Sequence, residues 1–210
     1  MKLIPTLAVA LVGFTSFAAQ ADPVYLPVGA QANVALSTVN GGGWTQCYAA
    51  TMSVFIGNSA ENVLNVCQGD YLMMAGRATG SDTFLALAAA LRADTIIDTG
   101  NTSNTHTANG AEWWYSDFWS WGFTALGDTV TNSECDVSSS PLSMCLHTIN
   151  AAGGFRINNI TGLNSSVAYE KVFFVANRGA SVPEPASLAL VGLALAGLAA
   201  SRRPRRAASA

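Results

Sequence analysis

Turn-forming residues interrupt the apolar sequence throughout residues 22–181, and this pattern restricts the fold more than any other feature. Gly41-Gly42-Gly43, Asp98-Thr99-Gly100 and Gly127-Asp128 each end an apolar segment. Gly accepts positive φ, and Asn, Asp and Ser bond to their own backbone, so these residues favour turns. Many short segments joined by turns predict a mainly β, antiparallel, β-sandwich-like domain.

Hydrophobic periodicity assigns the individual segments. Alternating apolar residues predict a strand within residues 31–39, whereas Asn58 and Glu61 match a capping box that opens a short helix. Residues 84–91 and the β-branched pair Ile96-Ile97 favour two strands, although the alanines of the first also suit a helix. One or two short helices are expected in all. Further strands are predicted within residues 44–56, 71–75, 155–160 and 168–175.

The first 21 residues have the pattern of a secretory signal peptide. Lys2 precedes an apolar core at residues 7–17, and Ala19-Gln20-Ala21 matches a small-residue cleavage site. An apolar core of this length is too short for a lasting membrane anchor. We therefore expect an N-terminal signal helix that is removed on export, leaving Asp22 as the first mature residue.

The exported part is more acidic than the whole chain, whose formal net charge is −3. Residues 22–181 hold five Lys and Arg against twelve Asp and Glu, which gives a net charge of −7. The whole chain is less acidic because four arginines lie in its last nine residues. Nucleic-acid binding depends on basic side chains that neutralise phosphates. The charge balance therefore argues against a nucleic-acid partner.

The exported part contains four cysteines, at Cys47, Cys67, Cys135 and Cys145. An even number of cysteines in an oxidising compartment predicts two disulfides, for which three pairings are possible. Proximity along the chain favours Cys47–Cys67 and Cys135–Cys145, each worth about 3 kcal/mol in the chain-entropy model. A four-cysteine metal site is disfavoured because the sequence has no C-x-x-C spacing.

The C-terminal residues combine three parts in a fixed order. Val182, Pro183, Glu184 and Pro185 come first, the apolar residues 186–200 follow, and residues 201–206 supply the basic side chains Arg202, Arg203, Arg205 and Arg206. As a helix, a 15-residue segment spans about 22 Å, which is less than the roughly 30 Å hydrocarbon core of a bilayer. The apolar segment therefore suits temporary retention in a membrane, with the arginines held on the cytoplasmic side.

This tail, over residues 182–206, resembles the PEP-CTERM sorting signal of bacterial exported proteins. The resemblance implies that an exosortase recognises residues 182–185 after the apolar helix has placed the precursor in the inner membrane. It also implies a cell-surface or extracellular destination in a bacterium that makes exopolysaccharide. Pro183 and Pro185 keep the motif extended, where a protease can reach it.

The body of the chain, from Trp44 to Phe123, resembles an uncharacterised module of exported bacterial proteins that is rich in Cys and Trp. Those proteins carry another cysteine pair near the positions of Arg77 and Arg156, which this chain lacks. The resemblance implies no catalytic residue.

Four of the five tryptophans lie within residues 113–123. Exposed Trp and Tyr rings stack on sugar faces, so Trp113, Tyr115 and Trp121 are candidates for glycan contact. In a strand, however, this run places aromatic side chains on both faces, and at least one face must be core. Core packing is the competing interpretation.

The sequence offers few candidate catalytic residues. His106 and His147 are the only histidines, and the sequence has no nucleophile elbow, zinc helix, P-loop or dinucleotide fingerprint. His106 with Asp98 or Glu112, or Glu112 with Asp117, are the conceivable acid–base pairs. We expect a non-enzymatic protein without a cofactor.

Metal binding has little support in the sequence. Asp94, Asp98 and Asp128 are possible calcium ligands, but no EF-hand-like loop contains them. We expect no bound metal.

The sequence thus predicts a signal peptide at residues 1–21, an exported domain at 22–181 and a sorting signal at 182–206. The predicted function is that of a surface or matrix protein associated with exopolysaccharide or biofilm. A carbohydrate-binding module and a secreted hydrolase are the alternatives.

Overall fold

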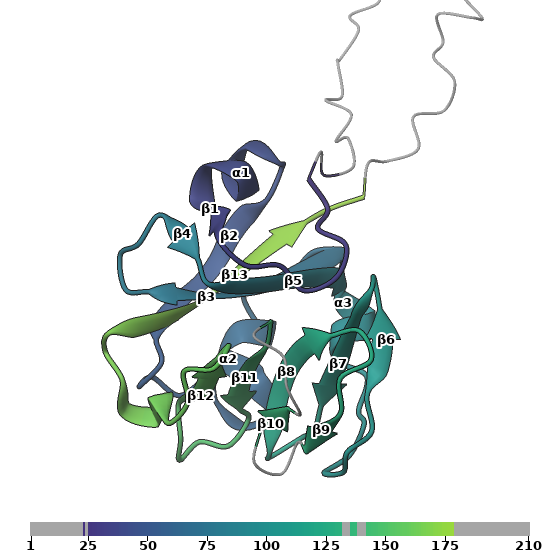
Figure 1. The fold of residues 1–210 in the computed structure, drawn as a ribbon, viewed down its shortest axis with the longest axis vertical. Coiled ribbons are helices and arrows are strands. Elements are labelled where there is room, and N and C mark those ends of the chain that lie inside the picture. The colour runs from purple at the N-terminus through teal and green to yellow at the C-terminus, as the bar shows by residue number, and fades with distance from the viewer. Residues whose placement is uncertain (1–22, 24, 132–134, 138–141, 179–210) are drawn as a thin grey trace, which may run out of the picture. The chain divides into compact units, whose positions relative to one another are not determined.

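The computed structural model describes residues 23, 25–131, 135–137 and 142–178 (Figure 1). The predicted signal helix, the sorting motif at residues 182–185, the apolar segment at 186–200 and the terminal arginines lie outside these residues. In the part that is described, no helix has both the length and the apolar character needed to cross a membrane.

The described chain consists of short strands and a few helical turns. In chain order these are β1 (Val34–Ala35), α1 (Leu36–Gly41), β2 (Thr45–Thr51), η1 (Asn58–Ala60), α2 (Glu61–Leu64), β3 (Tyr71–Ala78), β4 (Thr83–Phe84), β5 (Ala86–Leu91), α3 (Arg92–Thr95), β6 (His106–Ala108), β7 (Ala111–Tyr115), β8 (Ser120–Ala125), β9 (Val130–Thr131), β10 (Asp136–Val137), β11 (Met144–His147), β12 (Gly154–Ile157), η2 (Leu163–Ser165) and β13 (Tyr169–Ala176).

Two antiparallel sheets form the body of the domain (Figure 1). The four-stranded sheet has the order β2-β13-β3-β5, and the five-stranded sheet has the order β12-β11-β8-β7-β6. Two small ribbons, β1–β4 and β9–β10, accompany them. The prediction of a mainly β, antiparallel, sandwich-like fold with few short helices is confirmed.

Side chains from both sheets meet in one buried core. The indole of Trp121 on β8 stacks on the ring of Phe173 on β13, with 5.2 Å between centroids. Gly76 on β3 lets the sheets approach closely, because a Cβ there would lie 2.7 Å from Ile157 of β12. The aromatic run therefore supplies the middle of the sandwich.

The N-terminal segment covers the other face of the four-stranded sheet. Val39 and Trp44 pack there with Phe84 and Phe174 in a second buried cluster. The predicted strand at residues 31–39 is wrong over most of its length, since β1 is the single strand within it and α1 follows. Leu36 and Val39 are three residues apart, and one turn of helix brings both side chains onto the sheet.

Two further local predictions are wrong. The Asn58 side chain makes no capping bond, and its Oδ1 accepts a hydrogen bond from the Asn150 N–H at 2.9 Å instead. Residues 96–97 do not form a strand, because α3 ends at Thr95 and Ile96 caps it. At Asn58 a contact with a distant segment replaces the local pattern.

Both disulfides have the pairing that proximity favoured. Cys47 on β2 is bonded to Cys67, with Cα atoms 5.1 Å apart, and Cys135 is bonded to Cys145 on β11, with Cα atoms 5.6 Å apart. The first bond joins an edge strand to the segment after α2, whose Cys67 is fully buried in the core between the sheets. The predicted pair of disulfides is confirmed.

A buried lysine lies at one end of the same core. Lys171 on β13 has no solvent-exposed surface. Its Nζ donates hydrogen bonds to the carbonyl oxygens of Thr51, Met52 and Val54 at 2.8, 3.3 and 2.5 Å. Burial lowers the pKa of Lys171 to about 7, because the charged amine loses its hydration.

The stability of the domain should therefore rise with pH above neutrality. An unfolded chain keeps the Lys171 proton up to pH about 10.4, whereas the folded chain releases it above pH about 7. In this window the unfolded state binds more protons, so the free energy of unfolding should rise with a slope of at most about 1.4 kcal/mol per pH unit. Urea unfolding at pH 7.0, 7.75 and 8.5 measures the slope.

Lys171→Met is the matched control, since it cannot titrate. Its unfolding free energy should be flat over the same pH range, whatever its absolute stability. Equal slopes in the two proteins would contradict the assignment to Lys171.

Candidate functional site

The three aromatic residues predicted to contact glycan are buried. Trp113, Tyr115 and Trp121 are 1%, 7% and 0% exposed, and all three pack in the core between the sheets. A ring without an exposed face cannot stack on a sugar, so the prediction of glycan contact by these residues is wrong. Core packing, the competing interpretation, describes them correctly.

The exposed aromatic side chains of the run lie in the connection between β7 and β8. Phe118 is 59% exposed and Trp119 is 37% exposed. Asp117, which precedes them, is exposed as well. We call residues 117–119 the aromatic turn, and it is the candidate functional site of the domain.

A dense set of hydrogen bonds fixes the backbone of the aromatic turn. The Trp119 N–H donates to Thr148 Oγ1 at 2.7 Å, and the Thr148 N–H donates to the Trp119 carbonyl at 3.0 Å. Thr148 Oγ1 also donates to the Ser116 carbonyl at 2.6 Å. At the base of the turn the Ser116 N–H donates to the Ser120 carbonyl at 2.9 Å. The two rings are thus presented by a rigid loop.

The phenol of Tyr115 links the aromatic turn to η1. Its hydroxyl lies 2.7 Å from Asp117 Oδ1 and 2.9 Å from the Ser59 carbonyl oxygen. Burial, followed by the interaction with the Asp117 carboxylate, raises the pKa of Tyr115 well above its ordinary value. Tyr115 therefore stays protonated and acts as a hydrogen-bond donor that fixes this edge of the sandwich.

Three residues at the same edge have a strained backbone. Phe118 has φ 58°, and Ser59 and Ala60 have φ 53° and 56°. Positive φ is unfavourable for residues with a Cβ and rare for a bulky aromatic residue. Such residues cost roughly 1–3 kcal/mol each, and they cluster at binding sites. The strain directs a large apolar ring into solvent, where it contributes nothing to the core.

The structure separates the conceivable acid–base pairs. His106 pairs across the sheet with Trp113, whereas Glu112 pairs with Thr107, so the two side chains project from opposite faces. The Glu112 carboxylate accepts hydrogen bonds from the hydroxyls of Thr105 and Thr107 at 2.8 and 3.1 Å. Glu112 thus serves to join β6 and β7.

The aspartates of the other candidate pairs also have local partners. The Asp98 carboxylate accepts from the Gly100 N–H at 2.8 Å, as in a turn. Asp117 is held by the Tyr115 hydroxyl. The geometry therefore gives no support to a carboxylate pair at Glu112 and Asp117.

His147 is half-buried on the outer side of β11. Its ring lies edge-on to Phe155, with 5.9 Å between centroids. Burial lowers the pKa of His147, so the imidazole is neutral at pH 7.

The candidate calcium ligands do not form a site. Asp128 accepts a hydrogen bond from the Thr124 hydroxyl at 2.8 Å, and Asp98 is occupied by its own turn. Within residues 25–131, 135–137 and 142–178, no three His, Cys, Asp or Glu side chains gather closely enough to hold a metal ion.

The comparisons with known proteins concern the C-terminal residues. The family model of the PEP-CTERM protein-sorting motif matches residues 181–206. The chain carries a PEP-CTERM sorting signal. It is thus an exported protein that an exosortase processes, and the predicted recognition of the tail is confirmed.

No curated protein and no solved structure gives a significant match to this chain. The resemblance of the body to an uncharacterised exported module has no support from these comparisons. The two disulfides are consistent with export, since such bonds persist in oxidising compartments.

The three rings selected from the sequence are buried, whereas the exposed rings of the same run, Phe118 and Trp119, were not selected. The signal that separates them is the pair Ser116-Asp117, which favours a turn in the middle of the aromatic run. A turn at that point leaves the following Phe118 and Trp119 outside both strands. Trp113, Tyr115 and Trp121 lie within the two strands, and their side chains point into the core between the sheets.

Proposed function

We propose that the mature domain is a non-enzymatic component of the cell surface or extracellular matrix that contacts exopolysaccharide through its aromatic turn. The exposed pair Phe118–Trp119 carries this proposal, because Phe118 has a strained backbone and hydrogen bonds hold the backbone of Trp119. In the precursor, the apolar residues 186–200 hold the chain in the inner membrane until the exosortase acts.

The chemistry of the turn suits a sugar. Two apolar rings next to the Asp117 carboxylate offer faces for the C–H groups of a pyranose and an acceptor for its hydroxyls. A rigid turn lowers the conformational entropy lost on binding. The net charge of −7 on residues 22–181 favours a neutral polysaccharide over an anionic one.

Tryptophan fluorescence offers a direct test, because Trp119 is the exposed tryptophan and the other four are buried. Exopolysaccharide purified from the producing strain should shift the emission of the mature domain. Trp119→Phe should abolish the shift. Phe118→Asn and Trp119→Ala should each weaken binding about 2- to 12-fold, the range expected for an aromatic contact of about 0.5–1.5 kcal/mol.

Val167→Ala is the control, since Val167 is also an exposed apolar side chain but belongs to another loop. It should leave binding unchanged. A flat titration with the wild-type domain, in fluorescence and in co-sedimentation with the polysaccharide, would disprove the proposal.

A further inference from the structure

A polar groove lies in another part of the domain than the aromatic turn. An open groove of about 450 Å³ runs between α1 and the start of β4. Its volume is within the range of small-molecule sites. The residues that line it are Ala35, Leu36, Ser37, Asn40, Asp82 and Thr83.

Backbone pairing fixes the two walls of the groove relative to each other. Val34 pairs with Phe84 and Ala35 with Thr83 in the β1–β4 ribbon. The ribbon is extended by the Leu36 N–H, which donates to the Asp82 carbonyl at 2.8 Å. Since α1 begins at Leu36, the helix and the β3–β4 connection are tied together at the base of the groove.

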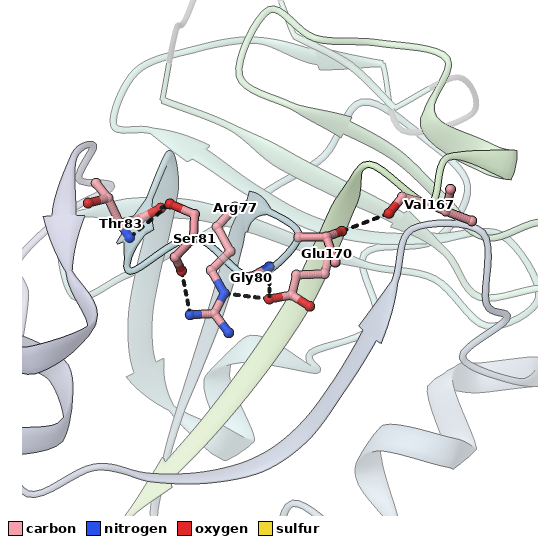
Figure 2. A network of polar contacts seen from close by, with 7 residues as sticks. Arg77, Gly80, Ser81, Thr83, Val167 and Glu170 are labelled. Carbon is pink, nitrogen blue, oxygen red and sulfur yellow. Dashed lines mark hydrogen bonds and ion pairs between the residues drawn. The ribbon is translucent and has the colours of Figure 1, made fainter.

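An ion-pair network braces the wall that carries Asp82 and Thr83. Figure 2 shows Arg77 reaching from β3 to Glu170 on one side and to Ser81 on the other. Arg77 Nε donates to Glu170 Oε1 at 2.6 Å, and Nη1 donates to the Ser81 carbonyl at 2.7 Å. The guanidinium also lies 5.2 Å from the centre of the Phe84 ring. Arg77 therefore fixes the β3–β4 connection, which forms this wall: it bonds to the connection at Ser81 and to β13 at Glu170.

The polar side chains of the groove are available to a ligand. Among the described residues, the side chains of Ser37, Asn40, Asp82 and Thr83 have no hydrogen-bond partner in the protein, and all four are exposed. Two hydroxyls and an amide both donate and accept, and the carboxylate accepts. This mixture matches the hydroxyl groups of a sugar, each of which is a donor and an acceptor.

The charge of the groove determines which class of sugar it can accept. Asp82 is the single ionisable side chain that lines it, and no lining residue is cationic. An anionic sugar would meet this carboxylate, in a domain of net charge −7, without a compensating positive charge.

We propose that the groove between α1 and β4 binds one or two units of a neutral saccharide through Ser37, Asn40, Asp82 and Thr83, and that Asp82 excludes uronic acids. The site does not depend on glycan binding at the aromatic turn. If both sites bind, one domain joins two polysaccharide segments, and the effective concentration at the second site raises the overall avidity.

The test uses the mature, disulfide-bonded domain and NMR titration of its amide signals. The probes are neutral tetrasaccharides with gluco, manno and galacto configuration, and a uronic-acid tetrasaccharide of the same length. At least one neutral probe should shift the amide signals of Ser37 and Asn40. The double variant Ser37→Ala/Asn40→Ala should bind that probe at least fivefold more weakly.

Two further variants separate the groove from the aromatic turn. Trp119→Phe should leave the groove affinity unchanged, so a failure at the aromatic turn does not remove this site. Asp82→Asn should bind the uronic-acid probe at least threefold more tightly than the wild type and the neutral probe within twofold. No shift at Ser37 and Asn40 with any neutral probe, or equal wild-type affinity for the neutral and uronic-acid probes, would overturn the proposal.

Discussion

Removing the Cys47–Cys67 disulfide should lower the free energy of unfolding by about 3 kcal/mol or more. The bond closes a loop with a sequence separation of 20 residues, for which the chain-entropy model gives about 3 kcal/mol. Cys67 is also fully buried with Val63 of α2 in the core between the sheets, so loosening this segment exposes apolar surface. The double variant Cys47→Ala/Cys67→Ala, compared with the wild type in urea unfolding, measures the loss.

The other disulfide is the internal comparison. Cys135–Cys145 closes a loop with a sequence separation of 10 residues and packs in a small cluster with Trp114 and Val130. Its removal should cost less than that of Cys47–Cys67, because the cluster lies outside the main core. Equal losses, or a greater loss for Cys135–Cys145, would show that the segment around α2 does not stabilise the sandwich.

Trp121→Ala should destabilise the domain by roughly 3–5 kcal/mol, the usual cost of truncating a buried tryptophan. The Trp121 ring contacts Phe173 from the opposite sheet and Tyr115 from its own sheet, with centroids 5.2 and 6.0 Å apart. Its Nε1 donates to the Thr95 carbonyl at 2.7 Å. Alanine leaves a cavity between the sheets and a buried carbonyl without its donor.

Trp119→Ala is the matched control in the same segment. Trp119 is 37% exposed and lies outside the core between the sheets, so the substitution should cost clearly less than Trp121→Ala. The pair of variants therefore separates the structural tryptophan from the candidate binding tryptophan. Similar losses for the two would contradict the assignment of Trp119 to the surface.

Features that depend on composition and turn chemistry were predictable from the sequence. The antiparallel β class follows from the frequent turn residues, and proximity gave the correct pairing of Cys47 with Cys67. The sorting tail was predictable because its motif, apolar segment and arginines are adjacent in sequence. None of these features requires knowledge of which segments lie side by side.

Features that depend on distant partners were not predictable. Asn58 fits a capping box locally, yet its amide oxygen accepts a hydrogen bond from the backbone of Asn150, 92 residues away. Likewise, the groove brings Asn40 and Asp82 together only through the β1–β4 pairing. The buried state of Lys171 depends on carbonyls about 120 residues earlier in the chain. Local periodicity carries no information about such partners.

The position of β13 has a consequence for the timing of folding during export. β13 is the last strand of the described chain, yet it lies between β2 and β3 and pairs with both. Val175 pairs with Thr45, so the four-stranded sheet closes only by joining the two ends of the exported domain. Such non-local closure is slow, because β2 and β3 have no partner between them until the last strand is in place. The sorting signal begins five residues after β13 ends, so the strand that completes this sheet is also the strand nearest to the signal along the chain.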